Sequence, residues 1–391
     1  MGSAPANDDP PLKGLKVLEL ARILAGPWAG QVLADLGATV IKVESPLGDD
    51  TRSWGPPFID RDGDRSAAYF YACNRGKQAV AADFKNDDDL RFVTELAGEA
   101  DVLIENFKVG GLDKYGLDYG AVSKRNPRII YASITGFGQN GPYADRPGYD
   151  FLLQAMSGLM SITGDAAGEP QKVGVAVTDL FTGLYAVIGI QAALHERQKS
   201  GRGQHIDLSL FDAATAMLAN QATNYLASGE SPHRMGNAHP NIVPYQVFHA
   251  MDGPLVIAVG NDEQFKRLCD VLGRQDLALD SRFQTNAGRV AARDKLIAAL
   301  ESEIVSWQKD KLLTALEKAT IPAAPVNTVA DALNDPQLIE RDMLIEPDAI
   351  SGLRTPLQFS RSSLASETTA PVLPVGENER TKPHWPRDKP R

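Results

Sequence analysis

The stretch VLELARILAGPWAGQVLADLGATVIKVE, residues 17–44, decides the fold. Its ends, Val17–Leu20 and Thr39–Glu44, are short apolar runs of the kind that form buried strands. Between them, Pro27–Leu36 is predicted as a helix, because proline is favoured in the first helical turn. Gly37 follows as the residue that ends it. A strand, a helix and a second strand in this order predict parallel pairing of the strands.

The same alternation continues along the chain. Further strands are predicted at 78–82, 102–105, 128–133 and 205–210, with helices at 87–98, from Thr178 to about Lys199, and from near Asp212. Strands separated by helices of this length predict a doubly wound α/β sheet, whose ligands bind at the carboxyl ends of the strands.

The chain changes character after residue 223, where Asn224–Pro244 has the composition of a loop. A hairpin of Tyr245–His249 and Leu255–Val259, closed by Asp252-Gly253, is predicted next. Helices are expected at 263–272, 289–303 and 307–319, completing a smaller α+β unit. The predicted organisation is a large domain over 12–223, a linker over 224–244, a small domain over 245–321, and a return segment over 322–391.

Composition excludes several classes of protein. The net charge of −10 argues against nucleic acid as a partner, since phosphate contacts need clustered Lys and Arg. The two cysteines and six histidines show no disulfide framework and no metal-ligand spacing, so no metal site is expected. Residues 1–11 lack the pattern of a signal peptide, and the apolar run around 180–194 is short and interrupted. We therefore expect a cytoplasmic protein without a membrane segment.

Asp179 is the only charged residue between Lys172 and His195. Withdrawing a carboxylate from water is costly unless its surroundings compensate. Thr178 is a suitable N-cap, which would place Asp179 in the first turn of a helix, where the dipole favours negative charge. The residues alone leave two interpretations open: a nucleophile or base held in an apolar setting, or a helix-start aspartate that binds free N–H groups.

Familiar catalytic motifs are missing from the sequence. It contains no G-x-S-x-G elbow and no Walker A run, and the first strand–helix connection, residues 21–30, lacks G-x-G-x-x-G. These absences argue against an α/β-hydrolase, a P-loop nucleotide enzyme and an NAD enzyme. His239 is a candidate acid–base residue, with a loop histidine bonded to backbone as the alternative.

An ordered set of short motifs resembles the family III CoA-transferases, a group that includes formyl-CoA transferase, carnitine CoA-transferase and the α-methylacyl-CoA racemases. The set spans roughly residues 12–260. Its members are Ala25-Gly26-Pro27, Leu36-Gly37-Ala38, 40–44, Gly48–Arg52, Asn74–Lys77, Asp101–Phe107, Arg146–Asp150, Val177-Thr178-Asp179 and Gly201–Gln204. The resemblance implies a Rossmann-type large domain, a smaller α+β domain and a homodimer of two interlocked, ring-like chains.

The resemblance assigns the nucleophile to Asp179. In the transferases this carboxylate attacks an acyl-CoA thioester to give a mixed anhydride, and the released CoA thiolate then converts it to an aspartyl-CoA thioester. The acceptor acid reverses both steps. The substrates implied are an acyl-CoA and a carboxylic acid, with CoA as part of the substrate and no tightly bound cofactor.

The same resemblance implies a set of CoA contacts. They are Ala25, Ser45, Arg75, Asp83, Phe84, Lys85, Asn106, Phe107, Lys108, Lys114, Pro147, Gly148, Tyr149 and Asp150. Lys114 and Ser45 stand where formyl-CoA transferase has arginines, and Arg75 is expected to supply the phosphate contact that Ser45 lacks. Leu24 replaces a glutamine of that enzyme, which argues against formate or oxalate as the acid.

Two alternatives remain beside the transferase. The racemases of this family use a His in a Gly-His-Asp triplet, whereas this chain has Gly148-Tyr149-Asp150, and a neutral Tyr is a poor base at pH 7. A non-catalytic acyl-CoA-binding protein on the same fold is the other.

The segment 235–246 looks most like the subgroup that moves CoA from succinyl-CoA to glutarate-type acids. Arg234 or His239 is expected to pair with the distal carboxylate of such an acid. The glycine-rich loop that covers the nucleophile in the family falls on Val259–Asp262, so Gly260 and Asn261 are expected at the substrate.

Overall fold

The computed structural model describes residues 9–365, 367–373 and 384–386. The predictions for residues 1–11 and for the return segment 322–391 therefore fall partly outside the described residues. The chain divides into two compact units. Unit 1 comprises residues 1–159, 173–223 and 337–391, and unit 2 comprises 160–172 and 224–336.

Unit 1 is built on a six-stranded parallel sheet, as the alternating pattern predicted. Its order is β5 (Gln78–Ala81), β2 (Thr39–Glu44), β1 (Lys16–Glu19), β6 (Val102–Glu105), β7 (Ile130–Thr135) and β8 (His205–Ser209). This is the order of a doubly wound sheet, with the first strand in the middle. Predicted strand bounds agree closely, except that β7 begins two residues later than expected.

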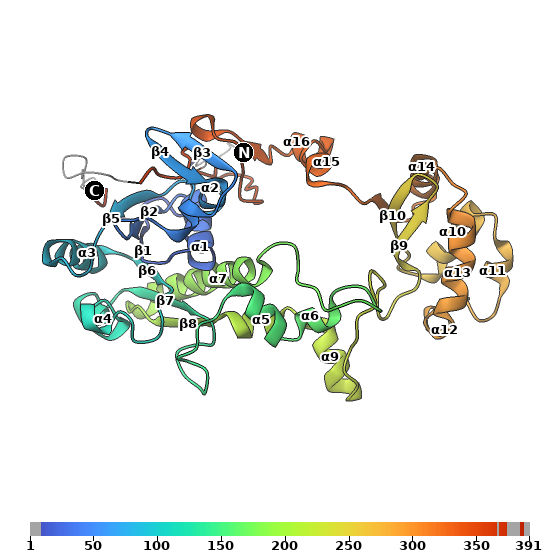
Figure 1. Ribbon diagram of the computed structural model, residues 1–391, viewed down its shortest axis with the longest axis horizontal. Helices are drawn as coiled ribbons and strands as arrows, with labels where there is room; N and C mark the ends of the chain where they lie inside the picture. Colours follow the sequence, from blue (N-terminus) through green and yellow to red (C-terminus); the bar gives the residue numbers. More distant parts are fainter. Residues whose placement is uncertain (1–8, 366, 374–383, 387–391) are drawn as a thin grey trace, which may run out of the picture. The chain divides into compact units, whose positions relative to one another are not determined.

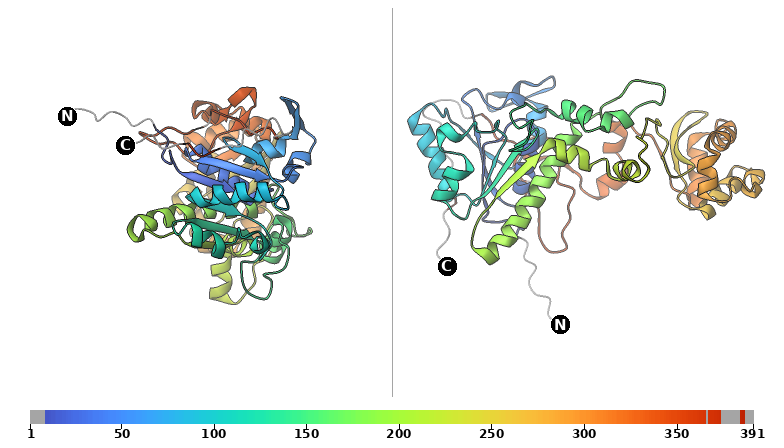
Figure 2. Two further views of the ribbon diagram at one scale, coloured as in Figure 1. Left: turned by 90° about the vertical axis from the view of Figure 1, so that its left-hand side faces the viewer. Right: turned by 90° about the horizontal axis from the view of Figure 1, so that it is seen from below.

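Helices cover both faces of this sheet. Helices α1 (Ala25–Asp35) and α7 (Val177–Ser200) pack on one face through Ala29, Leu33, Ala186 and Ile190. Helices α3 (Asp87–Glu99) and α4 (Tyr119–Arg125) pack on the other. Figures 1 and 2 show these layers from three directions. The apolar faces of helices and strands are thereby buried in two cores, one on each side of the sheet.

The start of α7 differs from the prediction. Thr178 does not cap the helix: the helix begins at Val177, and the residue before it, Ala176, makes no side-chain cap. Instead the Asp150 carboxylate accepts a hydrogen bond of 2.8 Å from the backbone N–H of Thr178. The Asp150 carboxylate therefore satisfies a free N–H at the start of α7, a function that we had assigned to the side chain of Thr178. Asp179 does lie in the first turn, as predicted.

Helix α7 agrees with the helix predicted from Thr178 to about Lys199, with one more residue at each end. It has 24 residues, and among the described residues it is the one helix long and apolar enough to cross a membrane. Its buried side, with Ala186, Val187, Ile190 and Ala193, belongs to the core under the sheet. The same test is passed by core helices of soluble proteins, and this helix packs against α1, β7 and β8.

Shorter elements surround the sheet of unit 1. They are η1 (Asp50–Ser53), β3 (Phe58–Arg61), β4 (Asp64–Ala67), α2 (Ala68–Cys73), η2 (Asp113–Tyr115), α5 (Asp150–Met156), α8 (Leu210–Ala216), β12 (Leu344–Ile345), η3 (Pro347–Ala349) and β13 (Gly352–Leu353). Helix α16 (Pro336–Glu340) begins at the last residue of unit 2. The β3–β4 hairpin and α2 were not predicted, because these segments are short and mixed in polarity.

Unit 2 contains the predicted hairpin, now β9 (Tyr245–Ala250) and β10 (Gly253–Ala258), extended by β11 (Ala323–Pro325). Its helices are α10 (Asp262–Val271), α11 (Gln275–Leu279), α12 (Asn286–Ala291), α13 (Arg293–Ile304), α14 (Lys309–Lys318) and α15 (Val329–Leu333). The helix predicted at 289–303 is in fact two helices that break at Ala292. Helix α6 (Leu159–Ile162) lies at the unit boundary, and α9 (Ala219–Ser228) continues into the predicted loop, so residues 224–228 were wrongly predicted.

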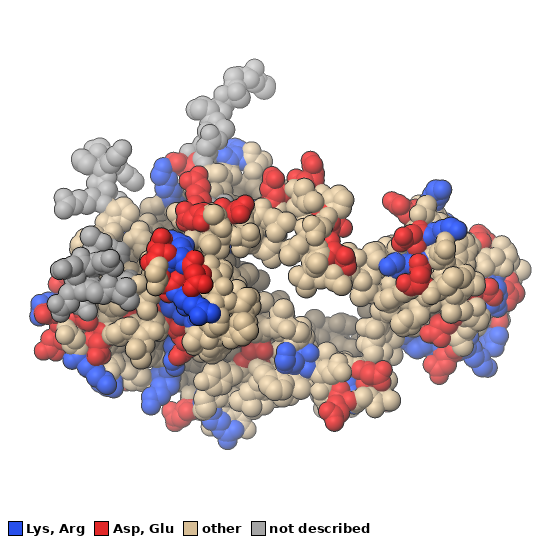
Figure 3. Space-filling view, turned by 45° about the horizontal axis from the view of Figure 1, so that its top comes forward, with Lys and Arg blue, Asp and Glu red and all other residues tan. Residues whose placement is uncertain are grey.

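Charge is mixed on the molecular surface. Acidic and basic side chains are interspersed on the face drawn in Figure 3. Among the described residues, no group of three His, Cys, Asp or Glu side chains is arranged to hold a metal ion.

Candidate active site

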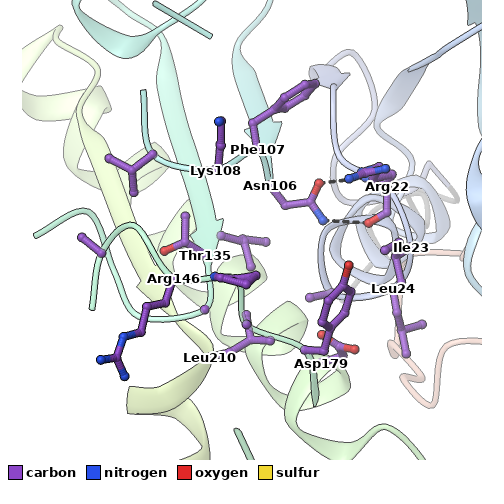
Figure 4. Close-up of a pocket in the computed structure, with 18 residues that line it drawn as sticks. Arg22, Ile23, Leu24, Asn106, Phe107, Lys108, Thr135, Arg146, Asp179 and Leu210 are labelled. Carbon is purple, nitrogen blue, oxygen red and sulfur yellow. Dashed lines mark hydrogen bonds between the residues drawn. The ribbon is translucent and has the colours of Figure 1, made fainter. Parts of the chain in front are cut away.

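The topology of the sheet places a ligand-binding position near its middle. Strands β1 and β6 are neighbours, yet β1 leads to α1 on one face and β6 leads toward α4 on the other. Parallel sheets bind ligands at such a switch point, beyond the carboxyl ends of the strands. A cavity of about 190 Å³ lies there, lined by residues 22–25, 106–109, 134–136, 144 and 146–149, and by Asp179 and Leu210 (Figure 4).

Asp179 brings a carboxylate into this cavity from the first turn of α7. Burial, together with the charge of the neighbouring Asp150 carboxylate, raises the pKa of this carboxyl to about 7. No hydrogen bond from the described residues to the Asp179 carboxylate opposes the shift. The result is a carboxyl group that ionises near neutral pH and is poorly solvated when charged, which favours nucleophilic chemistry.

A close helix crossing sets the position of Asp179. Gly183 lies one turn after it, and a Cβ atom at Gly183 would sit 2.7 Å from the carbonyl oxygen of Ala25 and 3.1 Å from Trp28. Only glycine therefore allows α7 to approach the first turn of α1 this closely. Because Ala25 also lines the cavity, this contact brings the starts of two helices to one place.

The start of α1 carries no cap of its own. Leu24, the residue before the helix, makes no side-chain hydrogen bond, and the first turn contains no acidic residue. Free N–H groups at a helix start favour a negatively charged group nearby. Leu24 and Ala25 face the same cavity as Asp179, so this helix start can stabilise negative charge that develops at the carboxylate or at a bound substrate.

Tyr69 is a residue that the sequence did not point to. Burial raises its pKa to about 12, and the charge of Asp179 contributes to the shift, which places the phenol within electrostatic range of that carboxylate. Its ring also packs edge-on against Trp54 at a centroid distance of 5.4 Å. Tyr69 lies in an apolar run on α2 without a motif, so no pattern distinguished it.

Many of the expected CoA contacts meet at this cavity. Those that line it are Ala25, Asn106, Phe107, Lys108, Pro147, Gly148 and Tyr149. Lys108 has no ion-pair partner in the described part of the chain, whereas Arg22 pairs with Asp50 at 2.8 Å and Arg146 packs over the ring of Tyr143. Lys108 is therefore the cation of this lining that is most available to an anionic ligand.

A second group of expected contacts forms an aromatic cluster beside Phe107. The Phe84 ring stacks on Phe107 at a centroid distance of 6.3 Å and meets Tyr115 edge-on at 5.4 Å. The ammonium group of Lys114 lies 4.7 Å from the centre of the Tyr115 ring. Flat aromatic surfaces next to cations suit a purine ring with attached phosphates.

The remaining expected contacts have other partners. Arg75 does not line the cavity: its buried guanidinium pairs with both oxygens of Asp35 and donates to Leu353 O, so the structure gives it a role in holding the C-terminal segment. Asp150 caps α7, as described above. Ser45 donates to the Gly48 carbonyl, while Asp83 accepts from the N–H of Lys85 in an exposed turn.

Comparison with known proteins decides the family. The family model of CoA-transferase family III matches residues 12–378. The chain belongs to CoA-transferase family III.

Several relatives match most of the length of this chain. The chain is 52% identical to a succinate–glutarate CoA-transferase of Agrobacterium fabrum, over 95% of both chains. It is 43% identical to an acetyl-CoA:oxalate CoA-transferase of Acetobacter aceti, over 92% of this chain and 91% of the relative. A solved structure of a CaiB/BaiF family protein from Brucella suis superposes with a TM-score of 0.85 at 59% identity, covering 93% of this chain and 96% of that one. The predicted resemblance to the glutarate subgroup is confirmed.

The residues of this family III chain that were expected at the acceptor acid lie in unit 2. Arg234 donates to two backbone carbonyls, those of Asp165 and Gly168, so it holds the loop formed by 163–171. His239 accepts the N–H of Asn241 on Nδ1 at 3.1 Å and packs on Tyr245, which leaves Nε2 as the donor nitrogen of the neutral ring.

The expected glycine-rich loop has clear local roles as well. Asn261 caps α10 by accepting the N–H of Gln264, and the N–H of Gly260 donates to the Gln264 side chain at 2.6 Å. These contacts give the loop a defined conformation within unit 2.

Proposed function

We propose that this protein transfers CoA from succinyl-CoA, the donor named for several relatives, to a short dicarboxylic acid. One observation carries the proposal: Asp179 holds a poorly solvated carboxyl, with a pKa of about 7, in a cavity at the sheet's switch point. A water-exposed aspartate would be a weaker nucleophile, because its charge would be dispersed by solvent.

The proposed reaction begins at the thioester carbon of the donor. The Asp179 carboxylate attacks this carbon and the C–S bond breaks. The CoA thiolate leaves, and a mixed anhydride between Asp179 and the donor acyl group remains on the protein. The thiolate then attacks the aspartyl carbonyl of the anhydride and releases the donor acid, which leaves an aspartyl-CoA thioester. The acceptor carboxylate attacks that thioester, and the thiolate freed in this step attacks the acceptor's carbonyl, so that acyl-CoA departs and Asp179 is regenerated.

Two features of unit 1 support these steps. The uncapped start of α1 at Leu24 and Ala25 suits the oxyanion that forms when the thioester carbon becomes tetrahedral. Lys108 and the cluster of Phe84, Phe107 and Lys114 suit the phosphates and adenine of CoA. We propose no tightly bound cofactor for this chemistry, because every step is a transfer between carboxyl and thiol groups.

A homodimer is part of the proposal. Large apolar side chains are exposed on the packed helices α5 and α7: Phe151 58%, Leu152 45%, Leu184 43%, Tyr185 41% and Ile188 61%. Exposed apolar patches of this kind on a soluble protein mark contact surfaces. The family resemblance implies a homodimer, and we propose that a second copy of the chain covers these side chains. A cytoplasmic setting suits the free, buried Cys73 and Cys269.

The decisive experiment replaces the nucleophile. Asp179→Ala is expected to abolish transfer of CoA from succinyl-CoA to glutarate while the protein still folds and binds CoA. Hydroxylamine added during turnover should modify Asp179 in the wild type, detected by mass spectrometry of the peptide, and should leave the variant unmodified. Substantial transfer by the variant would overturn the assignment.

A second experiment separates transfer from racemase chemistry. Incubation with a 2-methylacyl-CoA in deuterated water is expected to give no α-deuterium beyond the uncatalysed background, because Tyr149 stands where a basic His would be needed. Rapid incorporation of deuterium would favour a racemase over a transferase. If the wild type transfers CoA to none of the acids tested, a non-catalytic acyl-CoA-binding protein would be favoured.

A further inference from the structure

The turn between β1 and α1 contains a strained residue. Ile23 has a φ of +72°, in the left-handed region that β-branched residues avoid. Such a conformation is strained and persists only where neighbouring groups hold it. Ile23 lies between Arg22 and Leu24 in the wall of the cavity that contains Asp179, so the strained residue and the proposed nucleophile line the same cavity.

Groups from three separate segments hold this turn. The N–H of Ile23 donates to both carboxylate oxygens of Asp49, at 3.2 and 3.3 Å. The Ile23 carbonyl accepts from the thiol of Cys73 at 3.5 Å. Beside it, the Asn106 amide accepts from the N–H of Arg22 at 2.9 Å and donates to the Arg22 carbonyl at 2.7 Å, as drawn in Figure 4. The N–H and the carbonyl of both Arg22 and Ile23 are therefore hydrogen-bonded to side chains.

Asp49 is itself rigidly placed. Its buried carboxylate pairs with Lys42 at 2.9 Å and accepts from the N–H and the hydroxyl of Thr51, at 3.0 and 2.7 Å. Lys42 in turn pairs with Glu19 and donates to the carbonyl of Ala21 at 2.8 Å. The ion pairs thus bind the end of β1 as well as Asp49, so the support for Ile23 cannot shift without breaking buried charge contacts.

We propose that Asp49 and Asn106 are positioning residues that hold Ile23 in its left-handed conformation and thereby fix the start of α1 against Asp179. The inference rests on the proposed function and adds to it a role for two side chains that act through the backbone. Both faces of the Asn106 amide are bonded to Arg22, so its main task is to hold this turn, whereas the family resemblance had assigned it a direct contact with CoA.

A glycine-rescue experiment tests the proposal. Asn106→Ala and Asp49→Asn are each made alone, with Ile23→Gly, and with Ile23→Ala. Glycine adopts positive φ without penalty, whereas alanine also removes the Ile23 side chain but keeps the backbone cost. Each single variant should lower kcat/KM for succinyl-CoA and glutarate about five- to a hundredfold. Ile23→Gly should restore most of the loss, and Ile23→Ala should not.

Hydrogen exchange gives a readout that needs no activity. Amides of residues 20–28 should exchange faster in Asn106→Ala and in Asp49→Asn than in the wild type, and Asp49→Asn keeps the fold testable because it preserves side-chain size and one acceptor oxygen. Unchanged exchange in both variants would overturn the proposal. Equal rescue by Ile23→Gly and Ile23→Ala would overturn it as well, since the backbone would then be irrelevant.

The outcomes also separate this proposal from the function on which it rests. If Asn106→Ala raises only the KM for the acyl-CoA and Ile23→Gly restores nothing, Asn106 contacts CoA directly and the positioning role is wrong. If the wild type transfers CoA to no acid while exchange at 20–28 still follows the pattern above, the proposed function fails and the structural role of Asp49 and Asn106 stands.

Discussion

Two carboxylates at the start of α7 have different surroundings and therefore different chemistry. Asp150 accepts hydrogen bonds from the backbone of Thr178 and from the amide of Gln154, at 2.8 and 2.7 Å. Asp179 receives none from the described residues, and burial with the charge of Asp150 raises its pKa to about 7. Asp150 is therefore engaged in hydrogen bonds that support the fold, whereas the Asp179 carboxyl keeps the raised pKa of a buried acid.

The raised pKa of Asp179 predicts opposite trends for rate and stability. If Asp179 is the nucleophile, as proposed, it must be ionised, so kcat/KM should fall as pH drops below about 7. A carboxyl whose pKa is higher in the folded than in the unfolded chain binds more protons when folded, so stability should fall as pH rises from about 4 to 7. Asp179→Asn should remove this penalty and raise the unfolding free energy at pH 8 by about 1–4 kcal/mol.

Thermal unfolding of both proteins at pH 5 and pH 8 measures the effect. The stabilisation by Asp179→Asn should be larger at pH 8 than at pH 5. An equal shift at both pH values would show that the carboxyl does not titrate in this window.

Arg234 and His239 provide the residue-level prediction for the acceptor. A charge-assisted hydrogen bond contributes roughly 1.5–3 kcal/mol, so losing one should lower kcat/KM about ten- to a hundredfold for glutarate. Arg234→Ala and His239→Ala should affect butyrate much less. Equal losses with both acids would mean that Arg234 acts only through the carbonyls of Asp165 and Gly168, as a support for its loop.

At the level of elements, the crossing of α1 and α7 positions the site. The two helices meet where Gly183 leaves room for the carbonyl of Ala25. Helix α7 then delivers Asp179 one turn earlier, next to the start of α1. The strand order places this crossing at the switch point of the sheet. The cavity therefore depends both on the topology of the sheet and on the glycine at position 183.

Gly183→Ala is therefore predicted to lower both stability and activity. The added Cβ would come within 2.7 Å of a backbone oxygen, which forces the helices apart. We expect a loss of about 1–3 kcal/mol in unfolding free energy and at least a tenfold loss in kcat/KM.

Gly189→Ala is the matched control in the same helix. Its Cβ would lie 3.3 Å from the Ile206 side chain, which must yield by a few tenths of an ångström, and would meet no backbone of another element within 4 Å. Alanine also favours helix by about 1 kcal/mol over glycine, which offsets this small cost. This variant should keep stability and activity near the wild type. Similar losses in both variants would mean that the close crossing is not the cause.

At the level of the whole molecule, the apolar face of α5 and α7 predicts self-association. Ile188→Glu places a charge on this face, where Ile188 is 61% exposed in the single chain. Burying an unpaired carboxylate between two chains is costly, so the dimer should dissociate, as measured by light scattering after size-exclusion chromatography.

Leu279→Glu is the control for this prediction. Leu279, on α11 of unit 2, is also a highly exposed apolar residue, at 78%, yet it lies outside α5 and α7. The Leu279→Glu variant should have the same oligomeric state as the wild type. A wild type that elutes as a monomer would contradict the proposed homodimer.

The sequence by itself determined the strands of the sheet, helices α1, α3 and α7, and the place of Asp179 in a helical turn, whereas α4 was not predicted. Alternating strand and helix patterns are local, so β1, β2, β6 and α3 could be predicted within a few residues. The motif set also indicated the family. The sequence did not reveal Tyr69, which has no motif, nor the true cap of α7, because Asp150 precedes Thr178 by 28 residues.

Only the tertiary structure decided the environment of the site. The pKa of Asp179, the use of Arg75 by Asp35 and the strain at Ile23 all depend on groups far apart in the chain. Desolvation, ion pairing and backbone strain are properties of a packed environment, which a linear pattern cannot specify. Local preference therefore determined which elements form, and packing determined what their side chains can do.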